Sequence, residues 1–297
     1  MTTISPHDFP PATYVSATWL AQHIDDADLI VLDATIDREA KPDGGGLYRD
    51  GHALFVNDGH LPHARFADLF KAFSDPLAKY PFTKPARDAL QAVLRALGVT
   101  TRSTIVVYDR LNGVWAARVW WVLRAFGLTD VAVLDGGMRH WVRQGGALEF
   151  GVAPIAPAGD VVLRETPGYL VDLAQMKAVV DGERDAKSFC ALRHRDFTGE
   201  GSDDPRRGHI PGSRSLPFAD LLDENGLFEP ARLRVQIDAH GIRNEDTLVL
   251  YCGGGVAACG LALGLVALGF DAKRLSVYDG SLSEWRADPT LPVVVGE

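Results

Sequence analysis

The sequence predicts an α/β protein built from two copies of one unit, each a mostly parallel sheet flanked by helices. Three observations support this prediction. Short runs of valine, isoleucine and leucine end at turn residues, as buried parallel strands do. Helix-length apolar segments, such as 114–126 and 256–268, alternate with these runs, which is the pattern of α/β folds. The order of motifs in the first half also recurs in the second.

The first half contains three runs that we expect to be strands. They are Leu29–Asp33, Ile105–Asp109 and Val131–Asp135, and the last is followed by Trp141. The motif Gly59–Pro62 lies between the first two runs. Because parallel strands need crossover connections, we expect mostly right-handed crossovers through the helical segments.

The second half repeats this order with Gly208–Pro211, Leu248–Cys252, Leu275–Asp279 and Trp285. Residue 252 follows residue 109 by 143 positions, and residues 279 and 285 follow 135 and 141 by 144. The histidine motif is offset by 149 positions, from His60 to His209. Offsets this similar, in the same order of motifs, indicate internal duplication.

The boundary between the copies is expected in a segment without helical period. Residues 149–160 contain two prolines and two glycines, a composition typical of linkers. We therefore expect a non-catalytic domain at 1–148, a linker at 149–162 and a catalytic domain at 163–297.

Composition excludes several classes of protein. With 30 lysines and arginines against 39 acidic residues, the net charge of −9 opposes binding to nucleic acid or to anionic membranes. Three cysteines in 297 residues are no disulfide framework and fit a reducing compartment. The N-terminus has no basic stretch leading into an apolar core, and no uninterrupted apolar run approaches 18 residues. We expect a cytoplasmic protein.

One position stands out as a candidate nucleophile. The strand that ends at Asp109 in the first copy ends at Cys252 in the second. A cysteine between a parallel strand and a helix lies where open α/β sheets bind ligands and where the helix dipole stabilises a thiolate. Glycines 253–255 allow backbone N–H groups to close around an anion. The alternative is that Cys252 is a small buried hydrophobe, the commoner role of an isolated cysteine.

Two other interpretations of this loop have less support. Gly253, Gly255 and Ala258 fit a dinucleotide-binding fingerprint, but too little chain follows to complete a βαβ continuation. A cysteine phosphatase would need an arginine six positions after the cysteine, where Ala258 stands. Cys259 is expected in the core, and its distance from Cys252 does not fit a metal site, so no metal is predicted.

Residues that recur in both copies are expected to be structural. His60 and His209 hold equivalent places, although the first copy lacks the nucleophile, so a role in the turn or the strand entry is favoured. Trp120, Trp121 and Trp141 are expected to be core aromatics.

Taken together, these motifs resemble the tandem-domain rhodanese family of sulfurtransferases over nearly the whole chain. The motifs that carry the resemblance are Gly208–Gly212, Arg118–Trp121 with Phe126–Gly127, Leu134–Gly137 with Trp141, Tyr278–Ser281 with Glu284–Trp285, and Cys252–Ala257. The resemblance implies an N-terminal domain without a nucleophile and a C-terminal domain with the cysteine on a six-residue loop. The pair Asp109 and Cys252 agrees with this pattern.

The resemblance implies sulfur transfer through a Cys252 persulfide, without a cofactor. The donor would be a small anion, 3-mercaptopyruvate or thiosulfate, and the acceptor cyanide, a small thiol or a thioredoxin-like protein. The residues expected to bind the donor are Gly253, Gly254, Gly255, Val256 and Ala257, with Arg193 or Arg195 supplying positive charge. The alternative is a persulfide-binding or partner-docking protein with little turnover of small molecules.

The chain departs from the family pattern at three places. The loop looks more like the mercaptopyruvate branch, which commonly has a serine at position 254 and a histidine at position 82, whereas this chain has Gly254 and Phe82. The family usually reads Asp-x-Arg after the first strand of its catalytic domain, and here the sequence is Cys190–Leu192.

Overall fold

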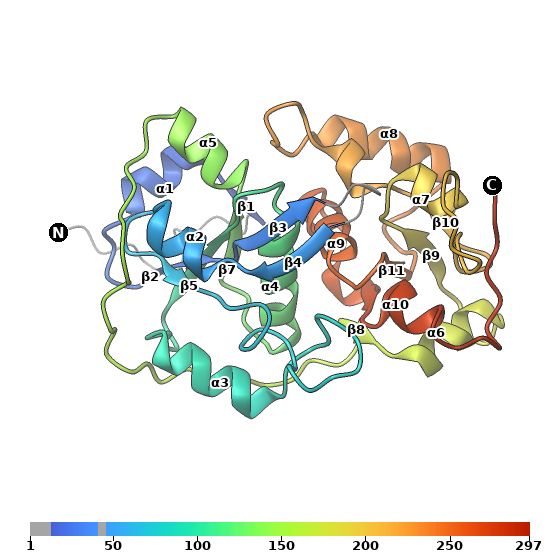
Figure 1. Cartoon of the computed structure of the whole chain (residues 1–297), viewed down its shortest axis with the longest axis horizontal. Coiled ribbons are helices and arrows are strands. Elements are labelled where there is room, and N and C mark those ends of the chain that lie inside the picture. Colours follow the sequence, from blue (N-terminus) through green and yellow to red (C-terminus); the bar gives the residue numbers. More distant parts are fainter. Residues whose placement is uncertain (1–12, 41–45) are drawn as a thin grey trace. The chain divides into compact units, whose positions relative to one another are not determined.

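The computed structural model describes residues 13–40 and 46–297, which form two compact units. The first unit contains the described residues up to Pro76, residues 84–165 and residues 225–227. The second contains residues 77–83, 166–224 and 228–297. Each unit has its own five-stranded parallel sheet (Figure 1). The second unit therefore includes a short piece of the N-terminal half of the sequence.

The sheet of the first unit has the strand order β1–β7–β6–β2–β5. Its strands are β1 (Tyr14–Val15), β2 (Leu29–Asp33), β5 (Arg65–Phe66), β6 (Thr104–Tyr108) and β7 (Val131–Leu134). Its helices are α1 (Ala17–His23), α2 (His52–Asn57), α3 (Arg87–Ala96), α4 (Val114–Ala125) and α5 (Gly137–Arg143). A separate antiparallel pair, β3 (Ile36–Ala40) and β4 (Gly46–Asp50), has no counterpart among the sequence predictions.

The sheet of the second unit has the strand order β10–β9–β11–β12–β8. Its strands are β8 (Leu170–Val171), β9 (Lys187–Cys190), β10 (Arg214–Ser215), β11 (Leu248–Tyr251) and β12 (Leu275–Tyr278). Its helices are α6 (Leu173–Val180), α7 (His194–Thr198), α8 (Pro230–His240), α9 (Ala257–Ala267) and α10 (Ser281–Trp285), with 3₁₀ turns η1 (Phe218–Leu221) and η2 (Ala272–Arg274).

The two sheets share one topology. Strands β8 to β12 occupy the places of β1, β2, β5, β6 and β7, with β11 central in the second sheet as β6 is in the first. The predicted fold class, two duplicated α/β units with parallel sheets, is confirmed. No helix in the described ranges is both long and apolar enough to cross a membrane.

The central strands and the helices after them are buried because their sequences are apolar on every side. All four residues of β11 are inaccessible to solvent, as expected for a parallel strand covered on both faces. In the first unit α4 packs on β6 and β7, and the indole N–H of Trp120 donates to the Val131 carbonyl at 2.9 Å. Trp120, Trp121 and Trp141 are core residues, as predicted.

The turns that contain His60 and His209 make equivalent contacts in the two units. His60 pairs with Glu149 and His209 with Val294 in isolated antiparallel bridges. Each imidazole stacks on a phenylalanine, with ring centroids 3.9 Å and 3.7 Å apart. These contacts are structural, as the recurrence of the two histidines in both copies predicted.

The residue after each histidine ties its turn to the end of the central strand. The N–H groups of Leu61 and Ile210 donate to the hydroxyls of Tyr108 and Tyr251, both at 3.1 Å. These tyrosines directly precede the two residues that the sequence comparison singled out, 109 and 252.

Candidate functional site

The candidate nucleophile Cys252 lies in the connection between β11 and α9. Its side chain is almost fully buried, with 2% of the residue exposed. Gly255 has a φ of +74°, a left-handed conformation that glycine adopts without strain. This turn brings the chain into α9, whose first residue is Ala257. The cysteine therefore stands at the carboxyl end of a central strand and just before a helix, as predicted.

The first turn of α10 holds the backbone of this loop from one side. The Cys252 N–H donates to the Ser281 hydroxyl at 3.2 Å, and the Cys252 carbonyl accepts the Leu282 N–H at 3.1 Å. The Gly253 carbonyl accepts both the N–H (2.8 Å) and the hydroxyl (2.7 Å) of Ser283. The motif that ends at Ser281 had been noted only for its resemblance to the family, and nothing in the sequence indicated a role for these serines.

Ser281 is fixed more tightly than an ordinary helix residue. It is fully buried, its φ is +47°, and its hydroxyl donates to the Tyr278 carbonyl at 2.8 Å. Because that proton is already used, the hydroxyl oxygen faces Cys252 as an acceptor. A left-handed serine costs about 1–3 kcal/mol and persists only where its surroundings determine it.

In the first unit, the equivalent connection between β6 and α4 surrounds the carboxylate of Asp109. The carboxylate of Asp109 is buried and accepts four backbone N–H groups at 2.8–3.1 Å, from Leu111, Gly113, Trp115 and Ala116. Burial raises the pKa of Asp109, and the four N–H bonds oppose that rise by stabilising the anion. The strand-to-helix connection of this fold can therefore enclose one negative charge.

The Asp109 and Cys252 connections are anchored alike. The Asp109 carbonyl accepts the Met138 N–H from α5 at 3.0 Å, just as the Cys252 carbonyl accepts an N–H from α10. A thiolate or persulfide on Cys252 would carry its charge where the first unit has a carboxylate. Such an arrangement can stabilise an anion through backbone dipoles alone.

The other two cysteines are buried and lie outside the loop. Cys190 ends β9, in register with Tyr251, and burial raises the pKa of its thiol to about 12. It therefore stays protonated near neutral pH. Cys259 lies in α9, fully buried, and its thiol donates to the Gly255 carbonyl at 3.1 Å. All three cysteines are free thiols.

The predicted arginines lie at the start of α7 and are largely exposed. The side chains of Arg193 and Arg195 are 54% and 58% exposed, and both pair with Asp196, at 2.8 Å and 3.7 Å. Their part in donor binding stays a prediction.

A third arginine, Arg286, received no role from the sequence. Its guanidinium donates to the Gly208 carbonyl at 2.7 Å and interacts electrostatically with Cys190 and Tyr251. Burial lowers its pKa, although Asp204 acts in the opposite direction. Its position directly after the Glu284–Trp285 motif was the available signal.

A segment from the N-terminal half lies against the loop. Residues 77–83 belong to the second unit, and a Cβ built on Gly254 would lie 3.9 Å from both Phe82 Cδ2 and Pro81 Cγ. Positions 82 and 254, two of the three departures from the family pattern, are therefore neighbours in space.

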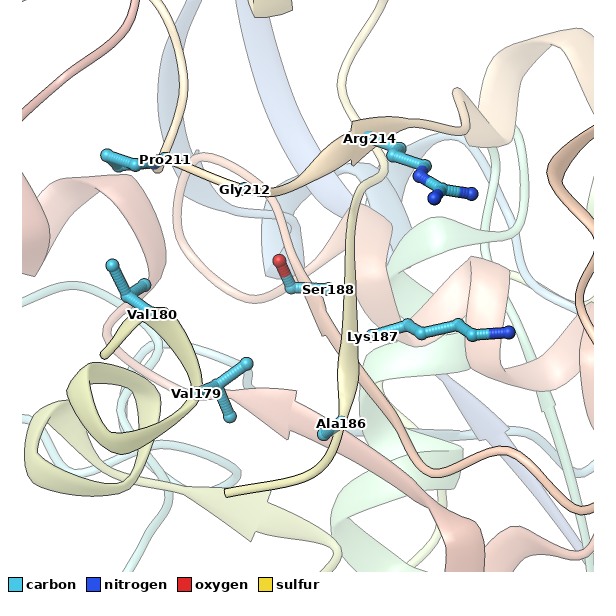
Figure 2. A pocket seen from close by; sticks show the side chains of 8 residues that line it. All are labelled: Val179, Val180, Ala186, Lys187, Ser188, Pro211, Gly212 and Arg214. Carbon is cyan, nitrogen blue, oxygen red and sulfur yellow. The ribbon is translucent and has the colours of Figure 1, made fainter. Parts of the chain in front are cut away.

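Two cavities in the second unit flank the strand β10. One, of about 190 Å³, lies between α6 and the strands β9 and β10; Figure 2 shows the Val179 and Val180 side chains across from the hydroxyl of Ser188. The other, of about 370 Å³, is lined by His194, His240 and eight further residues. Neither lining includes residues 252–257. In the described part of the chain, no group of three or more His, Cys, Asp or Glu side chains could hold a metal ion.

Comparison with known proteins gives consistent results. The model of the rhodanese-like domain matches residues 16–144 and 169–288. The chain is 34% identical to the 3-mercaptopyruvate sulfurtransferase of Escherichia coli (strain K12), over 94% of this chain and 97% of that protein. It is 36% identical to a probable 3-mercaptopyruvate sulfurtransferase of Pseudomonas aeruginosa, over 96% and 99%. The crystal structure of SseA from Escherichia coli superposes with a TM-score of 0.78 at 31% identity, covering 91% of this chain and 98% of that one.

Proposed function

The chain belongs to the rhodanese family, and we propose that Cys252 is the residue through which it moves sulfur from a small anionic donor to a thiol acceptor. Its relatives are 3-mercaptopyruvate and thiosulfate sulfurtransferases, and the chain is a sulfurtransferase of this kind. The reaction is assigned to residues 163–297, and residues 1–148 form the non-catalytic copy.

The observation that carries the proposal is the exchange of Asp109 for Cys252 between two equivalent loops. In the first unit a side-chain carboxylate fills the anion site permanently. In the second unit the cysteine places sulfur there instead, and the backbone of residues 253–257 would stabilise the charge of a thiolate or persulfide. No cofactor is needed for this chemistry.

The proposed reaction has two displacement steps. The Cys252 thiolate attacks the outer sulfur of the donor, and the bond between that sulfur and the rest of the donor breaks. Its electron pair leaves with sulfite when the donor is thiosulfate, or with the enolate of pyruvate when the donor is mercaptopyruvate. The enolate then takes up a proton. In the second step an acceptor thiolate removes the outer sulfur of the persulfide and restores the Cys252 thiolate.

We propose 3-mercaptopyruvate as the better donor. Thiosulfate is a compact dianion, and residues 253–257 contain no lysine or arginine to balance it. Mercaptopyruvate has one carboxylate, which a single arginine, Arg193 or Arg195, can hold with two hydrogen bonds. Its keto group spreads the charge that develops as the C–S bond breaks.

The physiological setting follows from the thiols. Three free cysteines, one of them the proposed nucleophile, fit a reducing compartment best, and we propose the cytoplasm. There a small thiol or a thioredoxin-like protein would be the acceptor.

A persulfide carrier with little turnover is the second candidate. The observation in its favour is that Gly254 and Phe82 offer no side-chain proton donor to the pyruvate enolate. Protonation would then depend on water, which would make the first step slow.

Multiple-turnover kinetics distinguish the two candidates. Pyruvate is measured while the protein reacts with mercaptopyruvate, first without and then with an excess of a thiol acceptor. A sulfurtransferase releases one pyruvate per protein without acceptor and many with it. Release that stops at one in both cases identifies the carrier, and release that persists in Cys252→Ser refutes the proposal.

A further inference from the structure

We propose that the Ser283 hydroxyl is a catalytic hydrogen-bond donor of the Cys252 site, where it stabilises the enolate that forms when a 2-oxo thiol such as 3-mercaptopyruvate loses its sulfur. This inference rests on the proposed function, because it concerns the first displacement step at Cys252. It is carried by the contacts of Ser283 with the loop 252–257, by the space over Gly254 and by the charge of the leaving group.

Helix α10 places Ser283 directly beside the loop that carries the nucleophile. The Ser283 N–H and hydroxyl both donate to the Gly253 carbonyl, at 2.8 Å and 2.7 Å. The preceding residue, Leu282, donates its N–H to the Cys252 carbonyl at 3.1 Å. Two backbone hydrogen bonds therefore hold this part of α10 against Cys252 and its neighbour, and neither of them depends on the hydroxyl.

The Ser283 hydroxyl borders open space on the loop. A Cβ built on Gly253 would have no contact within 4 Å, and a Cβ built on Gly254 would find its nearest contact, the Ser283 hydroxyl oxygen, at 3.8 Å. The next two atoms, Phe82 Cδ2 and Pro81 Cγ, lie at 3.9 Å and are carbon. Ser283 is half-buried, so part of it is accessible to a ligand. A donor molecule over Gly254 therefore meets the Ser283 hydroxyl as its nearest polar side-chain group.

The Ser283 hydroxyl can donate to a ligand without releasing the loop. When its proton turns away, the Gly253 carbonyl keeps the hydrogen bond from the Ser283 N–H and is not left without a partner. Ser281 has no such freedom, because its hydroxyl donates to the Tyr278 carbonyl and accepts the Cys252 N–H in a fully buried position. Of these two serines, Ser283 is therefore the one suited to bind a substrate.

The first displacement step creates a charge that such a hydrogen bond stabilises. The Cys252 thiolate attacks the sulfur of mercaptopyruvate and the C–S bond breaks. Its electron pair passes through the methylene carbon to the keto oxygen, which becomes an enolate oxygen. A hydrogen bond to that oxygen strengthens as the charge develops, so it stabilises the transition state more than the bound donor. Water then protonates the carbon and completes pyruvate. The Ser283 hydroxyl thus supplies from α10 a polar group that Gly254 lacks.

The test compares two reactions of Cys252 in full-length Ser283→Ala. One is the single-turnover rate of pyruvate release at saturating mercaptopyruvate, measured without an acceptor. The other is alkylation of Cys252 by iodoacetamide, which needs a thiolate in an intact loop but forms no enolate. We expect pyruvate release to slow about 10- to 100-fold, the effect of losing one hydrogen bond to a charged group. The rate of alkylation and its pH midpoint should stay at the wild-type values.

A hydroxyl placed on the loop itself should rescue the variant. Serine fits position 254, because Gly254 has no positive φ and its Cβ would make only ordinary van der Waals contacts. Adding Gly254→Ser to Ser283→Ala should therefore restore much of the rate of pyruvate release. Adding Gly254→Ala should not, since alanine brings the same Cβ without a hydroxyl. Ser202→Ala, at an exposed position of the same unit, should react like the wild type.

The possible outcomes separate this inference from the proposed function. Unchanged pyruvate release in Ser283→Ala overturns the role of Ser283. So does an equal slowing of pyruvate release and alkylation, which would mean that the hydroxyl only supports the loop. Equal rates of pyruvate release in the two double variants overturn it as well, and in each of these cases sulfur transfer by Cys252 stands. A wild type whose Cys252 is alkylated but which releases no pyruvate overturns both.

Discussion

Replacing Asp109 by asparagine should destabilise the first unit and leave sulfur transfer intact. The carboxylate accepts four backbone N–H groups, two on each oxygen. An asparagine keeps one acceptor oxygen, so its NH₂ group would face two buried N–H donors. A buried donor left without a partner costs about 1–3 kcal/mol, and two such donors cost about 2–6 kcal/mol.

Urea unfolding followed by tryptophan fluorescence measures this cost. Trp285 is the only one of the six tryptophans outside the first half, so fluorescence reports mainly on the first unit. With an m-value of about 2 kcal/mol per molar urea, the midpoint should fall by about 1–3 M. Asp130→Asn, on the surface of the same unit, is the matched control and should unfold like the wild type.

Two results would refute this reasoning. If Asp109→Asn unfolds at the same urea concentration as Asp130→Asn, the four hydrogen bonds do not stabilise the loop. If folded Asp109→Asn no longer forms a persulfide at Cys252, the first unit takes part in the chemistry and is not a silent copy.

The remaining predictions concern the histidine turn of the second unit. Gly208→Ala should lower the melting temperature far more than Gly212→Ala; both glycines have positive φ, but only the Cβ at 208 would collide with the Val294 carbonyl. If the two variants have the same melting temperature, the close packing of Gly208 against the Val294 carbonyl does not contribute to stability. Burial lowers the pKa of His209 from its ordinary 6.5, because the folded protein favours the neutral imidazole. The contribution of His209 to the free energy of unfolding is therefore complete above pH 6.5 and is lost as the pH falls below that value. Urea midpoints measured from pH 7.5 down to pH 5 should fall less steeply in His209→Gln, and equal slopes would count against this cause.

Much of the fold could be predicted from the sequence, because central strands that are buried on both faces appear as continuous apolar runs. The run 248–251 is apolar throughout and becomes β11, and duplication supplied an independent check on each boundary. The shortest strands escaped this reasoning. A two-residue strand such as β10 has no measurable period, and its identity comes from pairing with β9.

The position of Cys252 was predictable because it depends on local order: a strand, a cysteine, glycines and a helix. The cysteine's environment was less predictable. Ser281 and Ser283 contact the loop through backbone groups, which leave no pattern in the sequence of the loop itself.

The contact between Phe82 and Gly254 joins positions about 170 residues apart, and neither residue type signals it. Comparison with the family pattern marked both positions as departures. Only the structure brings the two positions together.

The mass of the intact protein after reaction with mercaptopyruvate and removal of the excess donor tests the central claim most directly. Wild type, Cys190→Ser and Cys259→Ser should each gain one sulfur atom, because the two structural thiols are buried and protonated or bonded within the core. Cys252→Ser should gain none. A sulfur atom retained on Cys252→Ser, or lost only when Cys190 or Cys259 is replaced, would contradict the assignment of Cys252 as the sulfur carrier.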